Sequence, residues 1–344
     1  MNSHSLFPQQ PTQLTQTHLD CADSSSRTLI ICLDLKRRNA YTKYESLDAV
    51  AKIKKLIARI TTICDQLAQT EPQALWIITW RENGITDANS NYVSTLSKTY
   101  LKEELSKLSL QYTQLAIIGG LSSVKSVRDV GCNKKIIEIE DCYNAYQAFV
   151  TNEKNITLNA QWAKHLKQFT LLKNNRSTQL NIMRNTAYIF QQGNVMKHDK
   201  VLPFNETIDS KSQQEFNHVF QPAKANNANH FFNLTHPISK KIITIGIEIC
   251  FEHNRGILKK QANNNEAVDI HFILSDCVEL ECSYFYGKYV VHVDSRFDTS
   301  IIKTDLHSDK STDVFLYVNN LLEDNLELDE VTCERCESSL DLKF

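Results

Sequence analysis

The chain has 344 residues, 42% of them hydrophobic and 23% charged, with a formal net charge of −2, so it can bury one large core or two ordinary ones. This charge gives no basic footprint for nucleic acid, and no stretch reaches the ~20 continuous apolar residues that a membrane-spanning helix needs. The 10 cysteines are irregularly spaced and do not make a disulfide scaffold.

Residues 1–27 are rich in Ser, Thr, Gln and Pro and lack the apolar segment of a secretory signal peptide. We expect a disordered N-terminal tail here. Without a signal peptide the expected location is the cytoplasm, where cysteines stay as thiols. Export by a specialised secretion system would leave no mark in the sequence.

A strand and a long helix are predicted next. Thr28–Leu35 reads as a buried strand, and Ser46 is the expected N-cap of the helix, with Asp48 in its first turn. Lys52 and its basic neighbours should lie largely off the apolar stripe of this helix. The stripe consists of Val50, Ile53, Ile57, Ile60, Cys64 and Leu67.

The next strand, Ala74–Trp80, is followed by Arg81, by the carboxylate of Glu82 and by a turn. A third strand is predicted at Gln114–Ile118. Between the two lies an amphipathic helix with the apolar residues Leu96, Tyr100, Leu101, Leu105 and Leu108. This alternation of strands and helices predicts an α/β layered domain.

A long segment, residues 119–184, separates this part from a hairpin. Within it we predict a strand at Ile136–Ile139 and a partly helical stretch at Asp141–Phe169. The hairpin begins at Asn185–Phe190, turns at Gly193 and leads to Lys200. The rigid run Leu-Pro-Phe-Asn-Glu, which ends at Glu206, follows it.

The apolar run Ile242–Ile249 reads as a strand buried on both faces. It ends at Cys250, where a helix-like segment begins, and open α/β sheets present reactive groups at this end of their strands. Cysteines are also among the most buried core residues. Taken alone, Cys250 therefore favours a packed core thiol.

Taken in order, Glu82, Lys200 and Cys250 each follow a predicted strand. In this the chain resembles the nitrilase (carbon–nitrogen hydrolase) superfamily, whose triad is Glu, Lys and Cys in that order. The resemblance covers roughly residues 28–320 and implies a four-layer α-β-β-α sandwich. Residues 119–184 and 222–233 are then insertions, and residues 321–344 an acidic C-terminal tail.

The resemblance also implies a reaction. Glu82 acts as general base on Cys250, whose thiolate attacks an amide or nitrile carbon and forms a covalent intermediate. Lys200 and the backbone N–H of Phe251 stabilise the negative charge that develops. Glu206 orients the attacking group or water. No metal or organic cofactor is implied, and amides are favoured over nitriles because amidase-type branches are the larger part of the family.

Plainer interpretations of these residues stay open. Glu82 can be a solvated strand end, Lys200 competes with Lys197 for its role, and Glu206 can simply bond the Pro203 turn. Glu252 is better explained as a structural residue than a catalytic one.

Other features of the sequence depart from this pattern or stand outside it. His253 lies too near Cys250 to pair well with it. Cys333 and Cys336 form a C-x-x-C motif without a matching second pair for zinc. Arg81 stands where the family usually has proline, and it either binds a substrate carboxylate or forms a salt bridge elsewhere.

Beyond Cys250 the sequence predicts a short helix and three strands. The helix is Gly256–Asn263, and the strands are Ile270–Leu274, Tyr284–Val293 and Val314–Val318. The helix that normally builds the family dimer is not found here. A homo-oligomer is possible, but the usual dimer is in doubt.

The favoured function is hydrolysis of carbon–nitrogen bonds other than peptide bonds, with a small-molecule amide or nitrile as substrate. One alternative is a degenerate nitrilase-fold protein that binds a ligand or partner without turnover. A second keeps the covalent chemistry but transfers the acyl group to an amine or a lipid.

Overall fold

The computed structural model describes most of the region between the two chain ends. The described residues are 27–34, 46–87, 92–128, 130–152, 156–174, 179–204, 218–224, 229–262, 267–294, 298–304, 313–320 and 328–335. The predicted N-terminal tail up to residue 26 and the candidate residue Glu206 lie outside this part.

The protein is a mixed α/β structure with two β-sheets. The first sheet has the order β13-β12-β1-β2-β3-β4-β5, with β6 paired to β4. Strands β12, β1, β2 and β3 run parallel, β4 pairs antiparallel with β3, and β5 pairs antiparallel with β4. Its strands are β1 (Thr28–Asp34), β2 (Leu75–Trp80), β3 (Leu115–Arg128), β4 (Gln179–Gln191), β5 (Asn194–Asp199), β6 (His218–Phe220), β12 (Val314–Asn320) and β13 (Asp329–Val331).

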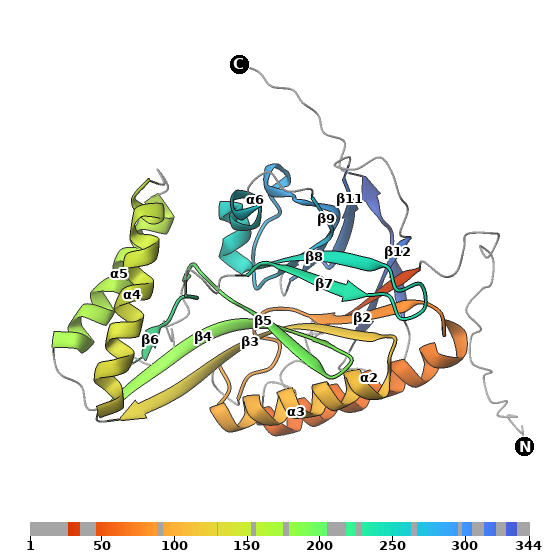
Figure 1. Ribbon diagram of the computed structural model, residues 1–344, viewed down its shortest axis with the longest axis horizontal. Helices are drawn as coiled ribbons and strands as arrows, with labels where there is room; N and C mark the ends of the chain where they lie inside the picture. Colours follow the sequence, from red (N-terminus) through yellow and green to blue (C-terminus); the bar gives the residue numbers. More distant parts are fainter. Residues whose placement is uncertain are drawn as a thin grey trace, which may run out of the picture.

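The second sheet has the order β14-β11-β10-β9-β8-β7. Strands β8, β9 and β10 run parallel, and β7 pairs antiparallel with β8. Its strands are β7 (Phe231–Thr235), β8 (Ile242–Ile249), β9 (Val268–Leu274), β10 (Gly287–Val293), β11 (Ser300–Lys303) and β14 (Glu334–Arg335). The two sheets face each other in Figure 1, and their facing side chains form one buried hydrophobic cluster.

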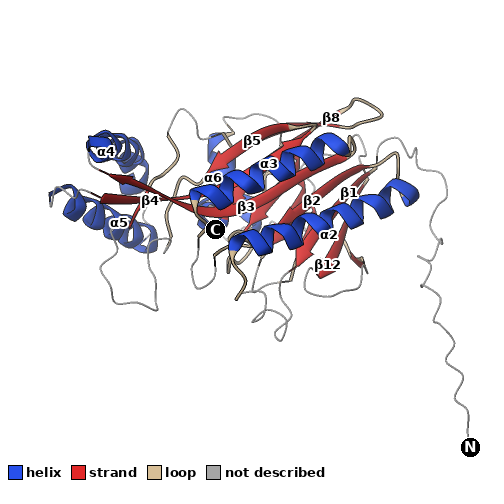
Figure 2. Ribbon diagram, turned by 90° about the horizontal axis from the view of Figure 1, so that it is seen from below, coloured by secondary structure: helices blue, strands red, loops and turns tan. Residues whose placement is uncertain are grey.

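Two helices, α2 (Ala49–Thr70) and α3 (Thr95–Gln111), cover the other face of the first sheet. They lie side by side across its strands in Figure 2. Alternate residues of each strand point to opposite faces, so Ile30 faces the second sheet whereas Leu29 and Ile31 pack against the helices. Helices, first sheet and second sheet therefore form successive layers, as the alternation of elements predicts.

The start of α2 corrects two expectations. The N-cap is Asp48, whose carboxylate accepts a hydrogen bond from the Ala51 N–H at 2.7 Å, and Ser46 lies outside the helix. Lys52 is fully buried rather than off the apolar face. Its ammonium donates to the Thr86 hydroxyl at 3.2 Å, which gives the buried charge a polar partner.

The long segment after β2 and α3 is built from an extended strand and a helical pair. Strand β3 pairs with β4 along its whole length, from Ala116 with Gln191 to Arg128 with Gln179. The helices α4 (Val130–Asn152) and α5 (Ile156–Asn174) stand at the far end of this ribbon. The strand predicted at 136–139 is wrong, because these residues belong to α4, whereas the predicted helical character of 141–169 is confirmed.

The second predicted insertion, residues 222–233, is only partly loop. Residues 231–233 begin β7, which pairs with β8 at the edge of the second sheet. Residues 225–228 lie outside the described part.

The outer face of the second sheet carries short helical pieces. These are the 3₁₀ helices η3 (Cys250–Arg255) and η4 (Cys282–Tyr284), and α6 (Ile257–Gln261). The helix predicted near residue 256 is thus confirmed. Part of the predicted tail also has structure, because β13 and β14 add edge strands to both sheets.

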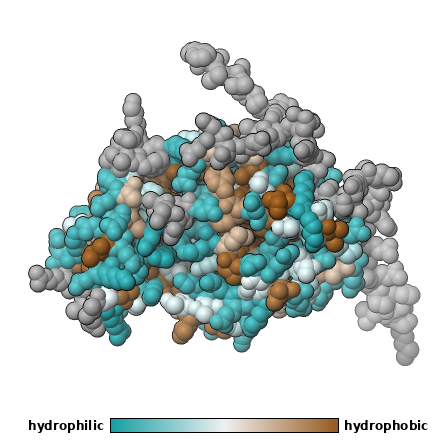
Figure 3. Space-filling model, in the orientation of Figure 1, coloured by the Kyte–Doolittle hydropathy of each residue, from teal (hydrophilic) through white to brown (hydrophobic). Residues whose placement is uncertain are grey.

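None of the described helices is long and apolar enough to cross a membrane. The face shown in Figure 3 is mostly hydrophilic, with apolar residues in smaller groups.

Candidate active site

The three predicted triad residues each follow the end of a different strand. Glu82 lies two residues after β2, Lys200 directly after β5, and Cys250 directly after β8. Strand β9 runs parallel beside β8, with Leu274 opposite Ile249. The observations below connect these ends to one another.

Glu82 and Lys200 form a buried ion pair. The Lys200 Nζ donates to Glu82 Oε1 at 3.1 Å, and the two side chains are 1% and 3% exposed. The Asn185 side-chain amide donates to the same Oε1. Charges are rarely buried unless they are paired and hydrogen-bonded in this way. The interpretation of Glu82 as a solvated strand end is therefore wrong.

The competing lysine has a different environment. Lys197 is exposed and pairs with Asp199, which lies on the same strand. Lys200 is turned inward, and its backbone N–H donates to the carbonyl of Asn185 at 2.8 Å. The hairpin thus delivers Asn185 and Lys200 together, one from each strand.

Glycine at position 120 allows the Glu82 turn to pack against β3. A Cβ atom at Gly120 would lie 2.8 Å from the Cα of Glu82, closer than real Cβ contacts allow. Trp80 adds a hydrogen bond from its indole N–H to the Gly120 carbonyl at 3.1 Å. The backbone around Glu82 is therefore fixed by a close approach that requires glycine.

Cys250 occupies a strained turn. It is 6% exposed and has a φ of 52°, a left-handed conformation that few residues other than glycine adopt. Such strain is stored mainly at functional sites. The turn ends β8 and starts η3, which sets the Phe251 backbone N–H at the beginning of the helical turn.

Glu252 joins the cysteine turn to the lysine turn. Its two carboxylate oxygens accept hydrogen bonds from Val201 N at 2.6 Å and from Ile249 N at 2.8 Å. These donors directly follow Lys200 and directly precede Cys250. The rings of Phe204 and Phe251 add a contact with centroids 4.9 Å apart. The predicted structural role of Glu252 agrees with these bonds, one of which caps the start of η3.

Arg81 connects the Glu82 turn to the second sheet. Its guanidinium binds the Asp276 carboxylate at 3.2 Å, and Asp276 lies just beyond the end of β9. Of the two predicted roles of Arg81, the structure contains the salt bridge.

His253 is directed away from Cys250. Its Nδ1 contacts Glu248 at 2.9 Å and its Nε2 accepts a hydrogen bond from Glu281 N at 3.1 Å. Both ring nitrogens are thus engaged on the outer face of the second sheet. His253 and Cys250 therefore do not form a dyad. The sequence predicts this, because the two residues are only three positions apart and their side chains point poorly at one another.

Sequence reasoning missed Asn185 as a member of the site. The sequence pattern presents Asn185 only as the start of the hairpin, yet its side-chain amide donates a hydrogen bond to Glu82, as Lys200 does. A buried polar residue at the head of an apolar strand was the available signal. Glu206 cannot be placed, because it lies outside the described residues.

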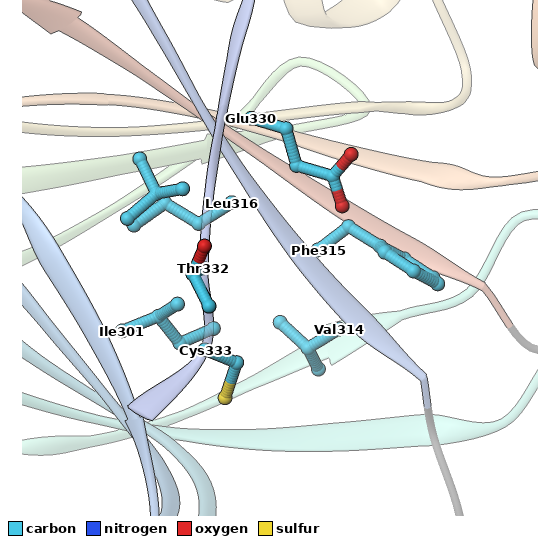
Figure 4. Close-up of a pocket in the computed structure, with 8 residues that line it drawn as sticks. Ile301, Val314, Phe315, Leu316, Glu330, Thr332 and Cys333 are labelled. Atoms are coloured by element: carbon cyan, nitrogen blue, oxygen red, sulfur yellow. The ribbon is translucent and has the colours of Figure 1, made fainter. Parts of the chain in front are cut away.

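A cavity of about 460 Å³ lies elsewhere, at strands β11, β12 and β13 and the residues that follow β13. Figure 4 shows Leu316, Val314 and Ile301 around it, with Glu330 from β13 and Cys333 from just before β14. The triad residues do not line it. Its lining has one carboxylate, one hydroxyl, one thiol and five apolar side chains.

No family model matches the sequence, and no curated protein matches it. Among solved structures, the chain is similar to the glutamine-dependent NAD+ synthetase from Acinetobacter baumannii in complex with ADP. That similarity has 12% identity and a TM-score of 0.34, over 72% of this chain and 36% of the other. A glutamine-dependent NAD(+) synthetase from Cytophaga hutchinsonii matches with 12% identity and a TM-score of 0.32, over 70% and 32%.

The chain thus spans about a third of the length of these solved chains. Similarity at this level is too low to transfer an activity.

Proposed function

We propose that this chain hydrolyses carbon–nitrogen bonds other than peptide bonds, as an amidase, with Cys250 as nucleophile. The observation that carries the proposal is the buried Glu82–Lys200 pair, linked through Glu252 to the turn that presents Cys250. A carboxylate, an ammonium and a thiol on separate strand ends are the groups that acyl transfer through a thioester needs.

The hydrogen bonds of Glu82 indicate which oxygen acts as the base. Within the described residues, the donors Asn185 and Lys200 both bind Oε1, so Oε2 is the oxygen left for proton transfer. This oxygen takes the thiol proton of Cys250 while the sulfur attacks the substrate carbon. Asn185 then positions the base and does not take part in the proton transfer.

The remaining steps follow from charge and proton balance. Attack forms a carbon–sulfur bond and a negative oxygen, which Lys200 and the Phe251 N–H stabilise. The carbon–nitrogen bond breaks, and the amine leaves with the proton held by Glu82. Water then attacks the thioester, giving its proton to Glu82, and the acid departs as the proton returns to Cys250.

The proposal also includes the four-layer architecture and the substrate class that the resemblance to nitrilases implies. A four-layer α-β-β-α sandwich would need η3, α6 and η4 to count as its fourth layer. The proposed substrate is a small-molecule amide, with nitriles as the second class, and the reaction itself calls for no organic cofactor.

The test is trapping of the intermediate. Incubation with a panel of small amides, nitriles and carbamoyl compounds, followed by intact-mass measurement, should give an acyl adduct and release of ammonia or amine. Cys250→Ala should abolish both signals, and Cys333→Ala should retain them, because Cys333 is exposed and remote from the triad. Turnover that survives in Cys250→Ala would refute the mechanism.

The same experiment addresses the alternative of a protein that binds without turnover. In that case no compound forms an adduct, and Cys250 reacts with iodoacetamide at the rate and pH dependence of an ordinary thiol. An activated nucleophile instead reacts faster than the other cysteines of the chain near neutral pH.

A further inference from the structure

A second group of buried polar side chains lies next to the candidate active site and is not used by the proposed reaction. His198, His230 and Glu252 are each 0% exposed. One nitrogen or oxygen atom from each lies within 4.8 Å of the other two. The imidazole rings of His198 and His230 are close, with centroids 4.0 Å apart.

Both histidines are held through the same ring nitrogen. His198 Nδ1 contacts the Asn229 carbonyl at 3.1 Å, and His230 Nδ1 contacts the Ile247 carbonyl at 2.9 Å. A carbonyl only accepts hydrogen bonds, so Nδ1 carries the hydrogen in both rings. Nε2 is therefore the nitrogen that each ring offers to the cluster. Histidines that bind metals are usually fixed in this way by a carbonyl or carboxylate.

The Nε2 atom of His230 has no hydrogen-bond partner within the described part of the chain, although the residue is fully buried. Because Nδ1 carries the hydrogen, the Nε2 atom of the neutral ring keeps a lone pair. Native proteins rarely leave a buried polar atom in this condition.

His198 and Glu252 hold a proton between them. His198 Nε2 lies 2.8 Å from Glu252 Oε2, and because Nδ1 already carries a hydrogen, this bond requires a second one. An ion bound at this point would take the place of that second hydrogen.

We propose that His198 Nε2, His230 Nε2 and a Glu252 carboxylate oxygen bind a zinc ion. Two imidazole nitrogens and one carboxylate oxygen form a donor set that zinc accepts. The ion replaces the extra proton of His198, so that one proton is released for each ion bound. The backbone donors Val201 and Ile249 remain on Glu252 and hold the ligand in place.

The geometry needs only a small adjustment. Zinc bonds of about 2.0–2.1 Å in a tetrahedral arrangement place ligand atoms about 3.4 Å apart. With all three atoms within 4.8 Å of one another, the farthest pair must approach by about 1.4 Å or less, and the His198 and Glu252 atoms, now 2.8 Å apart, must separate by about 0.6 Å. The fourth position would be taken by water.

A neighbouring cluster of similar composition, Glu248, His253 and His271, is hydrogen-bonded differently. Glu248 contacts His253 Nδ1 at 2.9 Å and His271 Nε2 at 3.0 Å. Because His253 Nε2 accepts from Glu281 N, its Nδ1 must carry the hydrogen and donate to Glu248. Both ring nitrogens directed at Glu248 therefore donate to it, and the one ring nitrogen without a partner in the described residues, His271 Nδ1, is not the one that meets the carboxylate. In the first cluster, by contrast, His230 makes no hydrogen bond to Glu252 within the described residues. The Glu248 cluster therefore serves as the matched control.

Zinc at the first cluster would join three segments, namely the end of β5, the start of β7 and the turn after β8. Two of these segments carry Lys200 and Cys250. The ion would thus stabilise the framework of the candidate active site. The inference does not depend on turnover, because its test measures binding alone.

The experiment uses the full chain, stripped with a chelator and titrated with ZnCl2 against a chromophoric zinc indicator, and with CoCl2 in parallel. We expect about one equivalent of tight binding, a Tm that rises with zinc, and cobalt absorption bands without thiolate charge transfer. His230→Ala and His230→Gln should each lower the zinc affinity at least 100-fold, whereas His271→Ala should retain it.

The glutamine variant keeps a polar side chain and guards against a folding defect of the alanine variant. Absence of tight zinc binding in the wild type would overturn the proposal. Equal binding in the wild type and both His230 variants would also overturn it, as would thiolate charge-transfer bands that place the metal on cysteines such as Cys333.

Discussion

At the scale of single residues, the candidate site depends on how a buried charge pair is held. The Glu82 carboxylate accepts from both Asn185 and Lys200, and such pairs are costly to break because the remaining charge stays buried. The same lysine is the only cation that the proposed reaction assigns to the developing oxyanion. Structural and chemical roles of Lys200 must therefore be separated by experiment.

Lys200→Ala should lower kcat by roughly 100- to 1,000-fold, the usual effect of removing one oxyanion donor. KM for a small amide should change much less, because the interaction is made mainly in the transition state. Steady-state kinetics with Lys197→Ala as control measures this, since Lys197 is exposed and pairs with Asp199 rather than with Glu82. An unchanged kcat in Lys200→Ala would assign the lysine to structure alone.

Gly120→Ala tests how closely the base is positioned. The added methyl group would lie 2.8 Å from the Glu82 Cα, so the Glu82 turn must shift. We expect a loss of kcat of roughly 10- to 100-fold with a folded protein by circular dichroism. Ser126→Ala, farther along the same strand, should leave kcat unchanged. Full activity in Gly120→Ala would show that the site tolerates displacement of its base.

At the scale of elements, sequence patterns predict the strands, turns and helices whose formation depends on neighbouring residues in the chain. The buried strand before Cys250, the hairpin before Lys200 and the helix over residues 49–70 were all predicted from periodicity and turn residues. The α4 helix was not, because Ile136–Ile139 is too short an apolar run to separate a strand from a buried helix. Tertiary packing decides such segments.

The three-residue cluster of His198, His230 and Glu252 could not be predicted for a related reason. Its members lie on separate segments and follow no metal-binding spacing, so only the folded chain brings them together. Edge strands such as β14, with two residues, likewise depend on partners distant in sequence. The role of Asn185 could not be predicted for the same reason, since its hydrogen-bond partner Glu82 is 103 positions away.

The packing of α5 against β6 should depend on pH through His165. This residue is 1% exposed, its ring lies 5.9 Å from that of Phe220, and burial, with smaller effects from Lys164 and Lys200, lowers its pKa to about 4. Between pH 6.5 and 4 the unfolded chain takes up a proton that the folded chain excludes. Stability is therefore fully present above pH 6.5 and falls as the pH decreases.

At pH 5 the His165 contribution should lower the free energy of unfolding by about 2 kcal/mol relative to pH 7.5. Urea titrations of the wild type and of His165→Gln at both pH values isolate it, because glutamine does not titrate. The loss between the two pH values should be smaller in the variant by this amount. Identical losses would mean that His165 becomes protonated within the folded protein.

At the scale of the whole molecule, one hydrophobic cluster joins the two sheets. It includes Ile30 and Ile77 from the first sheet and Ile247 and Phe272 from the second. The candidate site lies at the strand ends bordering this shared core, with Glu82 and Lys200 following strands of one sheet and Cys250 following a strand of the other. The proposed reaction, which needs all three residues at one site, thus requires the two sheets to remain packed together.

Ile247→Ala should therefore destabilise the entire fold. Ile247 is fully buried between the sheets, and an isoleucine-to-alanine change at such a position costs about 2–5 kcal/mol. Ile242→Ala on the same strand is the matched control, because Ile242 is 48% exposed and its loss should cost about 0.5 kcal/mol or less.

Trp76 and Trp80 lie in the first sheet and report on it by fluorescence, whereas the substitution lies in the second. If the shared core makes unfolding cooperative, the tryptophan transition and the circular dichroism transition shift together to lower urea. A tryptophan transition that stays at its wild-type midpoint while circular dichroism shifts would show that the sheets unfold separately.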